Sequence, residues 1–122
     1  MSAWGGIASL QLRLPVISTE AQQRGYSLTR MARWLCSGPA GLVGLNRKGS
    51  IAVGHDADLV IWSPKREFTV DPETLGHRHK LTPYAGEQLK GVVEKTFLRG
   101  RKIYDVATGH GELSGDIVSR VA

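Results

Sequence analysis

The sequence predicts an α+β fold in which a helical first part is followed by strands and loops. Up to about residue 46, apolar residues recur at spacings of three and four, as they do along one face of a helix. From Gly49 onward the chain instead has short apolar runs, rich in β-branched residues, between turns made of glycine and proline. Because helices precede strands without alternating with them, we expect two layers from different structural units. A stand-alone α+β domain fits the same order.

Two short helices are expected before the clearest one. Residues Ile7–Leu14 have the apolar spacing of a helix, and Pro15 should end it, because proline disrupts a helix interior. The next segment, Val16–Arg24, should close at Gly25, since glycine adopts the left-handed conformation of a helix end at little cost.

The third helix should begin at Ser27, a good N-cap, and stop at Gly38-Pro39. A further helical turn is expected at Ala40–Leu45. An apolar stripe of this third helix should pack against the rest of the fold, and it consists of Leu28, Met31, Ala32, Leu35 and Cys36. Cys36 is the single cysteine, which predicts a packed thiol and excludes an internal disulfide. We therefore expect an intracellular location, with the cytoplasm favoured over an organelle.

The second part of the chain predicts several strands. Leu59–Trp62 is expected to be a buried strand because it is short, apolar and β-branched. Phe68–Val70 predicts another short strand, and a loop-rich region should follow over residues 71–86.

An antiparallel hairpin is expected next. Its strands are Gly91–Leu98 and Lys102–Tyr104, joined at Arg99–Arg101, where glycine supplies the turn conformation. Residues 106–122 have three glycines and no sustained periodicity, and they predict a weakly ordered tail.

Length and charge exclude several classes of protein. At 122 residues the chain is far shorter than a complete TIM barrel, which needs roughly 250 residues. The net charge of +5 comes from cations spread along the chain, so we expect no nucleic-acid partner. No apolar run approaches the length of a membrane span, so we expect no membrane association.

Few residues point to catalysis. His77 and His79 alternate and could share a metal ion on a strand, but surface or subunit-interface hydrogen bonds fit their loop-like context better. Asp56 and Asp58 could form an acid/base pair, although aspartates also stabilise turns before a strand. The residues alone therefore identify no catalytic centre and no metal site.

Two segments resemble the C-terminal region of the amidohydrolase superfamily. Residues Lys48–Ile61 are similar to the segment where these enzymes pass from a metal-binding barrel to a small β-sandwich. Residues Val93–Tyr104 resemble the hairpin that completes that sandwich. Within the cyclic amidases, residues Ala3–Gln11 and His77–Gly86 look like the allantoinases more than dihydropyrimidinases, hydantoinases or dihydroorotases. The resemblance covers about residues 2–105.

The resemblance implies that this chain is the C-terminal portion of a longer enzyme. Residues 1–46 would be the last helices of a (β/α)8 TIM barrel, and residues 47–105 part of a composite β-sandwich. Residues 106–122 would be the weakly ordered tail. The family's metal ligands are histidines, a carboxylated lysine and an aspartate, and all would precede residue 1. No metal ligand or general base can be transferred to this chain.

The implied reaction is metal-dependent hydrolysis of the cyclic amide of allantoin to allantoate, in purine catabolism. Two divalent metals, expected to be zinc, would polarise the carbonyl and activate a bridging hydroxide. We expect this chain to bind neither metal and to be inactive alone. At full length, a homo-oligomer such as a tetramer is expected, with a small cyclic ureide as substrate.

The loop that contains Trp4, Gly5 and Gly6 is the one substrate-binding element that the resemblance implies. Gly5 and Gly6 would offer backbone groups to the ring amide, and Trp4 would form a wall of the pocket. Glycine suits this role because a side chain would block close approach of the backbone. A tight turn that caps the following helix explains the same residues.

Two other functions remain open. The chain could derive from another cyclic amidase of the dihydropyrimidinase or hydantoinase kind, or it could be a non-catalytic interaction module on an intact enzyme. The second alternative requires stable folding alone. Since an apolar sheet edge should stay uncovered, we expect poor stability in isolation.

Overall fold

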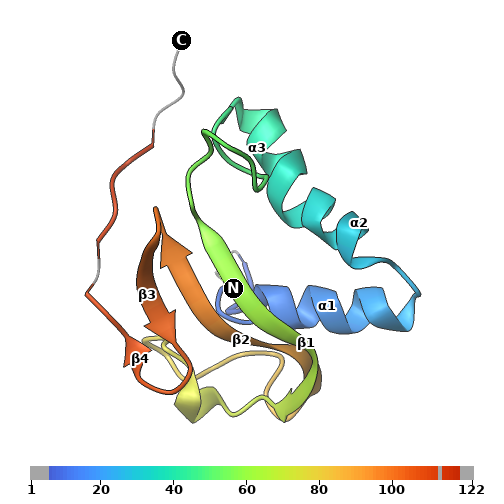
Figure 1. Cartoon of the computed structure of the whole chain (residues 1–122). Coiled ribbons are helices and arrows are strands. Elements are labelled where there is room, and N and C mark those ends of the chain that lie inside the picture. Colours follow the sequence, from blue (N-terminus) through green and yellow to red (C-terminus); the bar gives the residue numbers. More distant parts are fainter. Residues whose placement is uncertain (1–5, 113, 119–122) are drawn as a thin grey trace.

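The computed structural model, which describes residues 6–112 and 114–118, places a group of helices beside a curved antiparallel sheet (Figure 1). The helices come first in the chain and the strands second. This confirms the α+β order that the sequence predicts. No helix in the described ranges is long and apolar enough to cross a membrane.

Helix α1 spans Arg13–Gln23 and replaces the two short helices expected from the sequence. Pro15 does not end a helix, because it lies in the first turn, where a backbone N–H has no intrahelical partner to lose. The helix closes as predicted, with Gly25 in the left-handed region at φ +73°. Its buried face packs on the sheet through Thr19, whose hydroxyl accepts a hydrogen bond from Lys90 N at 2.8 Å.

Three helical segments follow without a break: α2 over Leu28–Ala32, a π-helical turn η1 over Arg33–Ser37, and α3 over Gly38–Val43. Ser27 caps α2 as predicted, since its hydroxyl accepts from Arg30 N at 3.3 Å. The prediction that Gly38-Pro39 stops the run is wrong. Pro39 lies in the first turn of α3, where a backbone N–H would have no intrahelical partner, so its missing N–H costs no hydrogen bond. The π turn η1 comes directly before α3.

The apolar stripe of these helices is largely uncovered. Met31 is buried, but Leu28 is 52% exposed and Cys36 is exposed, so the prediction of a packed thiol is wrong. Tyr26 and Trp34 instead pack edge to face at 5.1 Å, with the Arg30 guanidinium 5.2 Å from the Tyr26 ring. The prediction that the whole stripe packs against the rest of the fold is therefore wrong for the described chain, in which Met31 alone of the five is buried.

The sheet has the strand order β1-β2-β3-β4, with all neighbours antiparallel. Its strands are β1 over Leu59–Thr69, β2 over Gln88–Leu98, β3 over Arg101–Asp105 and β4 over Gly109–His110. The two strands expected at residues 59–62 and 68–70 are one strand, because an irregularity between Ser63 and Glu67 bends β1 without ending it.

The predicted hairpin is present, with Arg99 and Gly100 forming a two-residue turn between β2 and β3. Both residues have positive φ, 48° and 80°, as the tight hairpin turns that match sheet twist require. The tail prediction is wrong at its start, because β4 pairs with β3. Beyond β4, the described residues form no helix or strand.

Strand β1 lies at the edge of the sheet, so the expected buried strand is not buried in this chain. Val60 and Ile61 are 49% and 48% exposed. On the inner side, Gly91 of β2 lies over Trp62, and an added Cβ would be 2.7 Å from a ring carbon. Gly91 also has φ +107°, which other residues rarely adopt.

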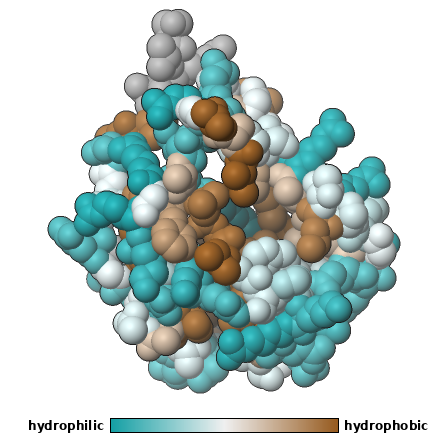
Figure 2. Space-filling view, in the orientation of Figure 1, coloured by the Kyte–Doolittle hydropathy of each residue, from teal (hydrophilic) through white to brown (hydrophobic). Residues whose placement is uncertain are grey.

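The core is small and joins the two halves of the chain. It consists of Leu12, Val70, Leu75 and Leu89, with Val16, Phe68 and Tyr84 packed at its margin. The chain exposes 9423 Å², whereas a compact monomer of 13.3 kDa exposes roughly 6,500 Å². Figure 2 shows apolar side chains, in brown, gathered on one open face.

The isolated chain is expected to be only marginally stable, because so much apolar surface remains in water. Circular dichroism on heating should show a broad transition with little cooperativity. A sharp, cooperative melt of the purified chain would contradict this expectation and would favour a self-sufficient domain.

Candidate functional site

The candidate substrate loop enters the described structure at Gly6. Trp4 and Gly5, the other two predicted contacts, lie outside the described residues. Gly6 has φ +97° and is exposed, and an added Cβ would meet no atom within 4 Å. Glycine is therefore required here by backbone conformation, while the space beside it is open.

The segment after Gly6 is tied to the loop region between β1 and β2. The Thr82 hydroxyl donates to the Ala8 carbonyl at 2.7 Å. The Gly76 amide donates to Gln11 Oε1 at 2.9 Å. The Thr82 bond joins the described part of residues 3–11 to residues 77–86, the two stretches on which the resemblance to the allantoinases depends, and the Gly76 bond holds Gln11 directly before the second stretch. Two segments that are far apart in the sequence thus lie side by side in the structure.

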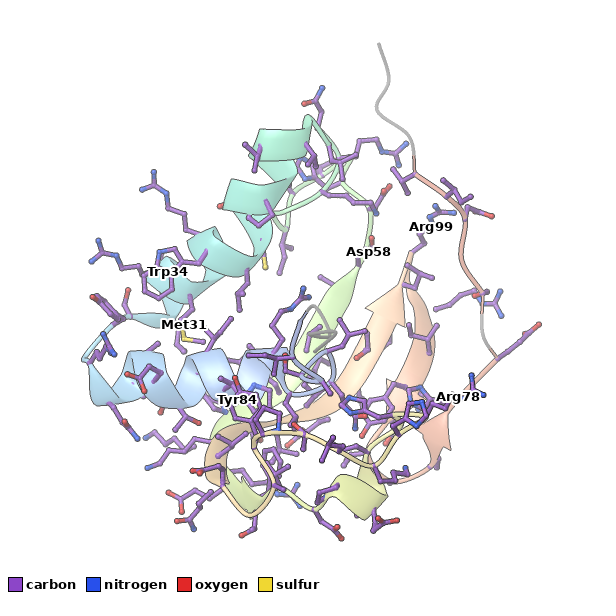
Figure 3. All side chains as sticks on the ribbon, turned by 180° about the vertical axis from the view of Figure 1, so that it is seen from behind. Met31, Trp34, Asp58, Arg78, Tyr84 and Arg99 are labelled. Carbon is purple, nitrogen blue, oxygen red and sulfur yellow. The ribbon has the colours of Figure 1, made fainter. Side chains whose placement is uncertain are left out.

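Thr82 is the most buried polar residue of this site, with only 5% of its surface exposed. Its oxygen also accepts a longer hydrogen bond from Tyr84 N, at 3.4 Å. Tyr84 packs against the core cluster beside α1 (Figure 3). The hydroxyl of Thr82 is therefore hydrogen-bonded both within its own loop, to Tyr84, and to the N-terminal segment, at Ala8.

The histidine pair does not form a metal centre. His77 is half-buried and His79 is exposed, and the Nδ1 atom of His77 is buried without a hydrogen-bond partner. No three His, Cys, Asp or Glu side chains gather within residues 6–112 and 114–118. The described residues therefore do not fit a divalent metal, and no catalytic step through one can be derived from them. Among the described residues His77 Nδ1 makes no hydrogen bond, and the subunit-interface hydrogen bond that the sequence also allows stays a prediction.

The two aspartates before β1 belong to a charged cluster. Lys48 Nζ lies 3.1 Å from Asp56 Oδ2 and also pairs with Asp58. Asp56 accepts from the Arg47 guanidinium at 2.9 Å. Asp58 accepts from the Arg99 amide at 2.8 Å, which fastens the entry of β1 to the turn of the hairpin; both residues are labelled in Figure 3.

These contacts argue against acid/base catalysis by the aspartates. The hydrogen bond from Lys48 is the largest cause that lowers the pKa of both Asp56 and Asp58. The same bonds raise the pKa of Lys48. Because both carboxylates stay ionised at neutral pH, neither is a proton donor, and the lowered pKa together with oxygens already paired makes each a weak base. The structure therefore favours the structural interpretation of the pair.

Sequence reasoning missed the residues that connect the site. Thr82 lies inside a stretch that the family resemblance singled out, but neither it nor Gln11 has a local pattern that reveals its distant partner. Lys48 lies at the start of the other recognised segment, and its position before two aspartates could have indicated an ion pair.

Replacing Asp58 by Asn should lower the free energy of unfolding at neutral pH, and this loss should shrink as the pH falls below the unfolded pKa of the carboxyl. A carboxylate with a lowered pKa stabilises the fold above its unfolded pKa of about 3.9, and this contribution is lost as the pH falls through the folded pKa. The loss should stay within about 1 kcal/mol because the pair is partly exposed. The unfolding midpoint between pH 7 and pH 2 measures it.

Glu112→Gln is the matched control, since it removes one exposed carboxylate from the ion pair with Arg101. It should leave the midpoint nearly unchanged. Equal losses of unfolding free energy for Asp58→Asn and Glu112→Gln would contradict the prediction, because they would mean that the ion pairs of Lys48 stabilise the fold no more than an exposed surface pair does.

Comparison with known proteins gives consistent matches. Residues 5–103 match the amidohydrolase family. The chain is 50% identical over 120 residues to the allantoinase of Streptomyces avermitilis, covering 98% of the chain and 26% of that protein. It is also 50% identical over 105 residues to "Probable allantoinase 2" of Dictyostelium discoideum, covering 85% and 21%. The chain thus spans about a quarter of the length of these curated relatives.

The fold also matches solved structures of related enzymes. L-Hydantoinase (dihydropyrimidinase) from Arthrobacter aurescens superposes with a TM-score of 0.78 at 31% identity, covering 93% of this chain and 25% of that one. The likeness thus extends over most of the elements described above.

Proposed function

This chain belongs to the amidohydrolase family, and we propose that it forms the C-terminal part of an allantoinase. The reaction would be hydrolysis of the cyclic amide of allantoin to allantoate. The single observation behind this proposal is the 50% identity to curated allantoinases over nearly the whole chain. The hydrogen bond from Thr82 to Ala8 adds support, because it joins the two stretches most like the allantoinases.

The chain's part in this reaction is to bind and orient the substrate. Members of the amidohydrolase family are generally metal-dependent, and a metal supplies the polarisation of the carbonyl and the activation of water when bound. The described residues of this chain do not fit that metal. We therefore infer that the ligands of two metals, expected to be zinc, are supplied from outside this chain.

The loop of Trp4, Gly5 and Gly6 is proposed to border the substrate pocket. Gly5 and Gly6 would offer backbone hydrogen-bonding groups to the cyclic ureide, with Trp4 as a wall. The left-handed backbone of Gly6 supports this role, since it leaves the main chain accessible from one side.

The remaining organisation is also a proposal. Residues 1–46 would complete a TIM barrel, residues 47–105 would belong to the β-sandwich, and a tail would follow strand β4. The packing of α1 against β2 indicates that the first two units share a core. We infer a homo-oligomer at full length, and an intracellular location.

A second candidate is a cyclic amidase with another substrate. The likeness to L-hydantoinase, with a TM-score of 0.78, favours it over unrelated functions. An interaction module without catalysis is the third, and the large exposed surface of the chain is the observation that favours it.

Two reciprocal grafts test the allantoinase proposal. In the first, this chain replaces the matched quarter of Streptomyces avermitilis allantoinase; in the second, it replaces the matched quarter of Arthrobacter aurescens L-hydantoinase. Hydrolysis of allantoin and of hydantoin is measured for both, relative to each parent. We expect the allantoinase graft to keep at least about a tenth of its parent's kcat/KM, and the hydantoinase graft to lose more than about a hundredfold.

Each parent with its matched quarter deleted is the control, and both should be inactive. An active hydantoinase graft beside an inactive allantoinase graft would favour the second candidate. Loss of both activities in folded grafts would sink the proposal that this chain serves a cyclic amidase.

A further inference from the structure

Thr82 makes a contact that connects two distant parts of the chain. Its hydroxyl reaches the Ala8 carbonyl at 2.7 Å across a sequence separation of 74 residues. A hydroxyl has one hydrogen to donate, and the Tyr84 amide can only donate to the same oxygen. The single O–H of Thr82 is therefore directed at Ala8.

Two further contacts hold the same segment beyond Ala8. Gln11 accepts from the Gly76 amide at 2.9 Å, and Leu12 is buried in the core against Leu75. Because residues 11 and 12 are fixed in this way, the Thr82 bond at Ala8 is the most N-terminal restraint among these three. Gly6 lies only two positions before Ala8, and its backbone has a conformation that glycine alone adopts easily.

We propose that Thr82 is a positioning residue, which acts through the Ala8 carbonyl to set the backbone of the loop that contains Gly6. The inference rests on the proposed function, in which this loop borders the substrate. A residue of the loop between β1 and β2 would then determine how well the enzyme binds its cyclic ureide. Loss of the bond leaves the Ala8 carbonyl to water, since Ala8 is exposed, so the segment gains freedom without a buried unpaired group.

Thr19 shows what a merely structural threonine does in this fold. Its hydroxyl donates to the Pro15 carbonyl at 2.8 Å and accepts from Lys90 N at 2.8 Å, and it has 8% of its surface exposed. One of its hydrogen bonds stays within α1, and the others join that helix to β2. The two threonines are thus similar in burial, and each hydroxyl both donates to a carbonyl and accepts from an amide, although Thr19 also makes a longer contact with the Lys90 carbonyl at 3.5 Å.

The test compares Thr82→Val, Thr82→Ser and Thr19→Val in the Streptomyces avermitilis graft. Thr82→Val keeps the shape and removes the donor, so KM for allantoin should rise about threefold to tenfold, with kcat within about twofold. Thr82→Ser restores the hydroxyl and should restore KM. Thr19→Val should lower the unfolding midpoint without changing KM.

A second readout does not depend on catalysis. Amide hydrogen exchange of residues 6–12 should be at least about threefold faster in Thr82→Val than in Thr82→Ser, with no such change in Thr19→Val. An unchanged KM together with unchanged exchange in Thr82→Val would overturn the positioning role. If the parent graft is inactive, the proposed function fails, and exchange alone still decides whether Thr82 orders the segment.

A further variant covers the case in which Thr82→Val does not fold. Gln11→Met removes the second polar restraint from an exposed side chain. A raised KM with faster exchange of residues 6–12 would support control of the loop from the region between β1 and β2. A Gln11→Met graft with the parent's KM and exchange rate would contradict it.

Discussion

The fold depends on the burial of Leu12 against Leu75 and Leu89. This contact joins the start of α1 to the loop region and to β2, and it is the place where the helical part meets the sheet. Few other apolar side chains of the described chain are fully buried, so little else could hold the two parts together. Once Leu12 is fixed, α1 can lie along β2 and Thr19 can meet the backbone of Lys90. The polar contacts of the site follow from the same packing, because Ala8 and Gln11 lie within four positions of Leu12 along the chain.

Local features were predictable from the sequence because their causes are local. Ser27 caps a helix and Arg99-Gly100 turns a hairpin through the conformations of the residues themselves. Both prolines were misread for one reason, which is that proline blocks a helix only where an N–H is needed. Pro15 lies in the first turn of α1 and Pro39 in the first turn of α3. The π turn before Pro39 has no sequence signature from which it could have been predicted.

Exposure and long-range contacts could not be predicted in this way. The apolar runs in β1 and α2 have the composition of buried segments, yet much of their surface is open because the described chain does not cover it. Thr82 and Gln11 have partners more than sixty positions away, and no pattern along the chain encodes such a distance. The resemblance to a family located the right segments, but only the structure shows that they touch. Of the three predicted substrate contacts, the structure describes Gly6 alone.

The close approach of Gly91 to Trp62 bears on how this chain can evolve. A side chain at position 91 would collide with the indole, and it would also have to adopt φ +107°. Replacing Trp62 by a small residue relieves only the collision, because the backbone conformation belongs to position 91 itself. Substitution at the two positions should therefore be asymmetric across homologues: Trp62 is free to vary while glycine stays, whereas a change at 91 requires the strand to be rebuilt. Covariation between the pair would then be weak despite their contact.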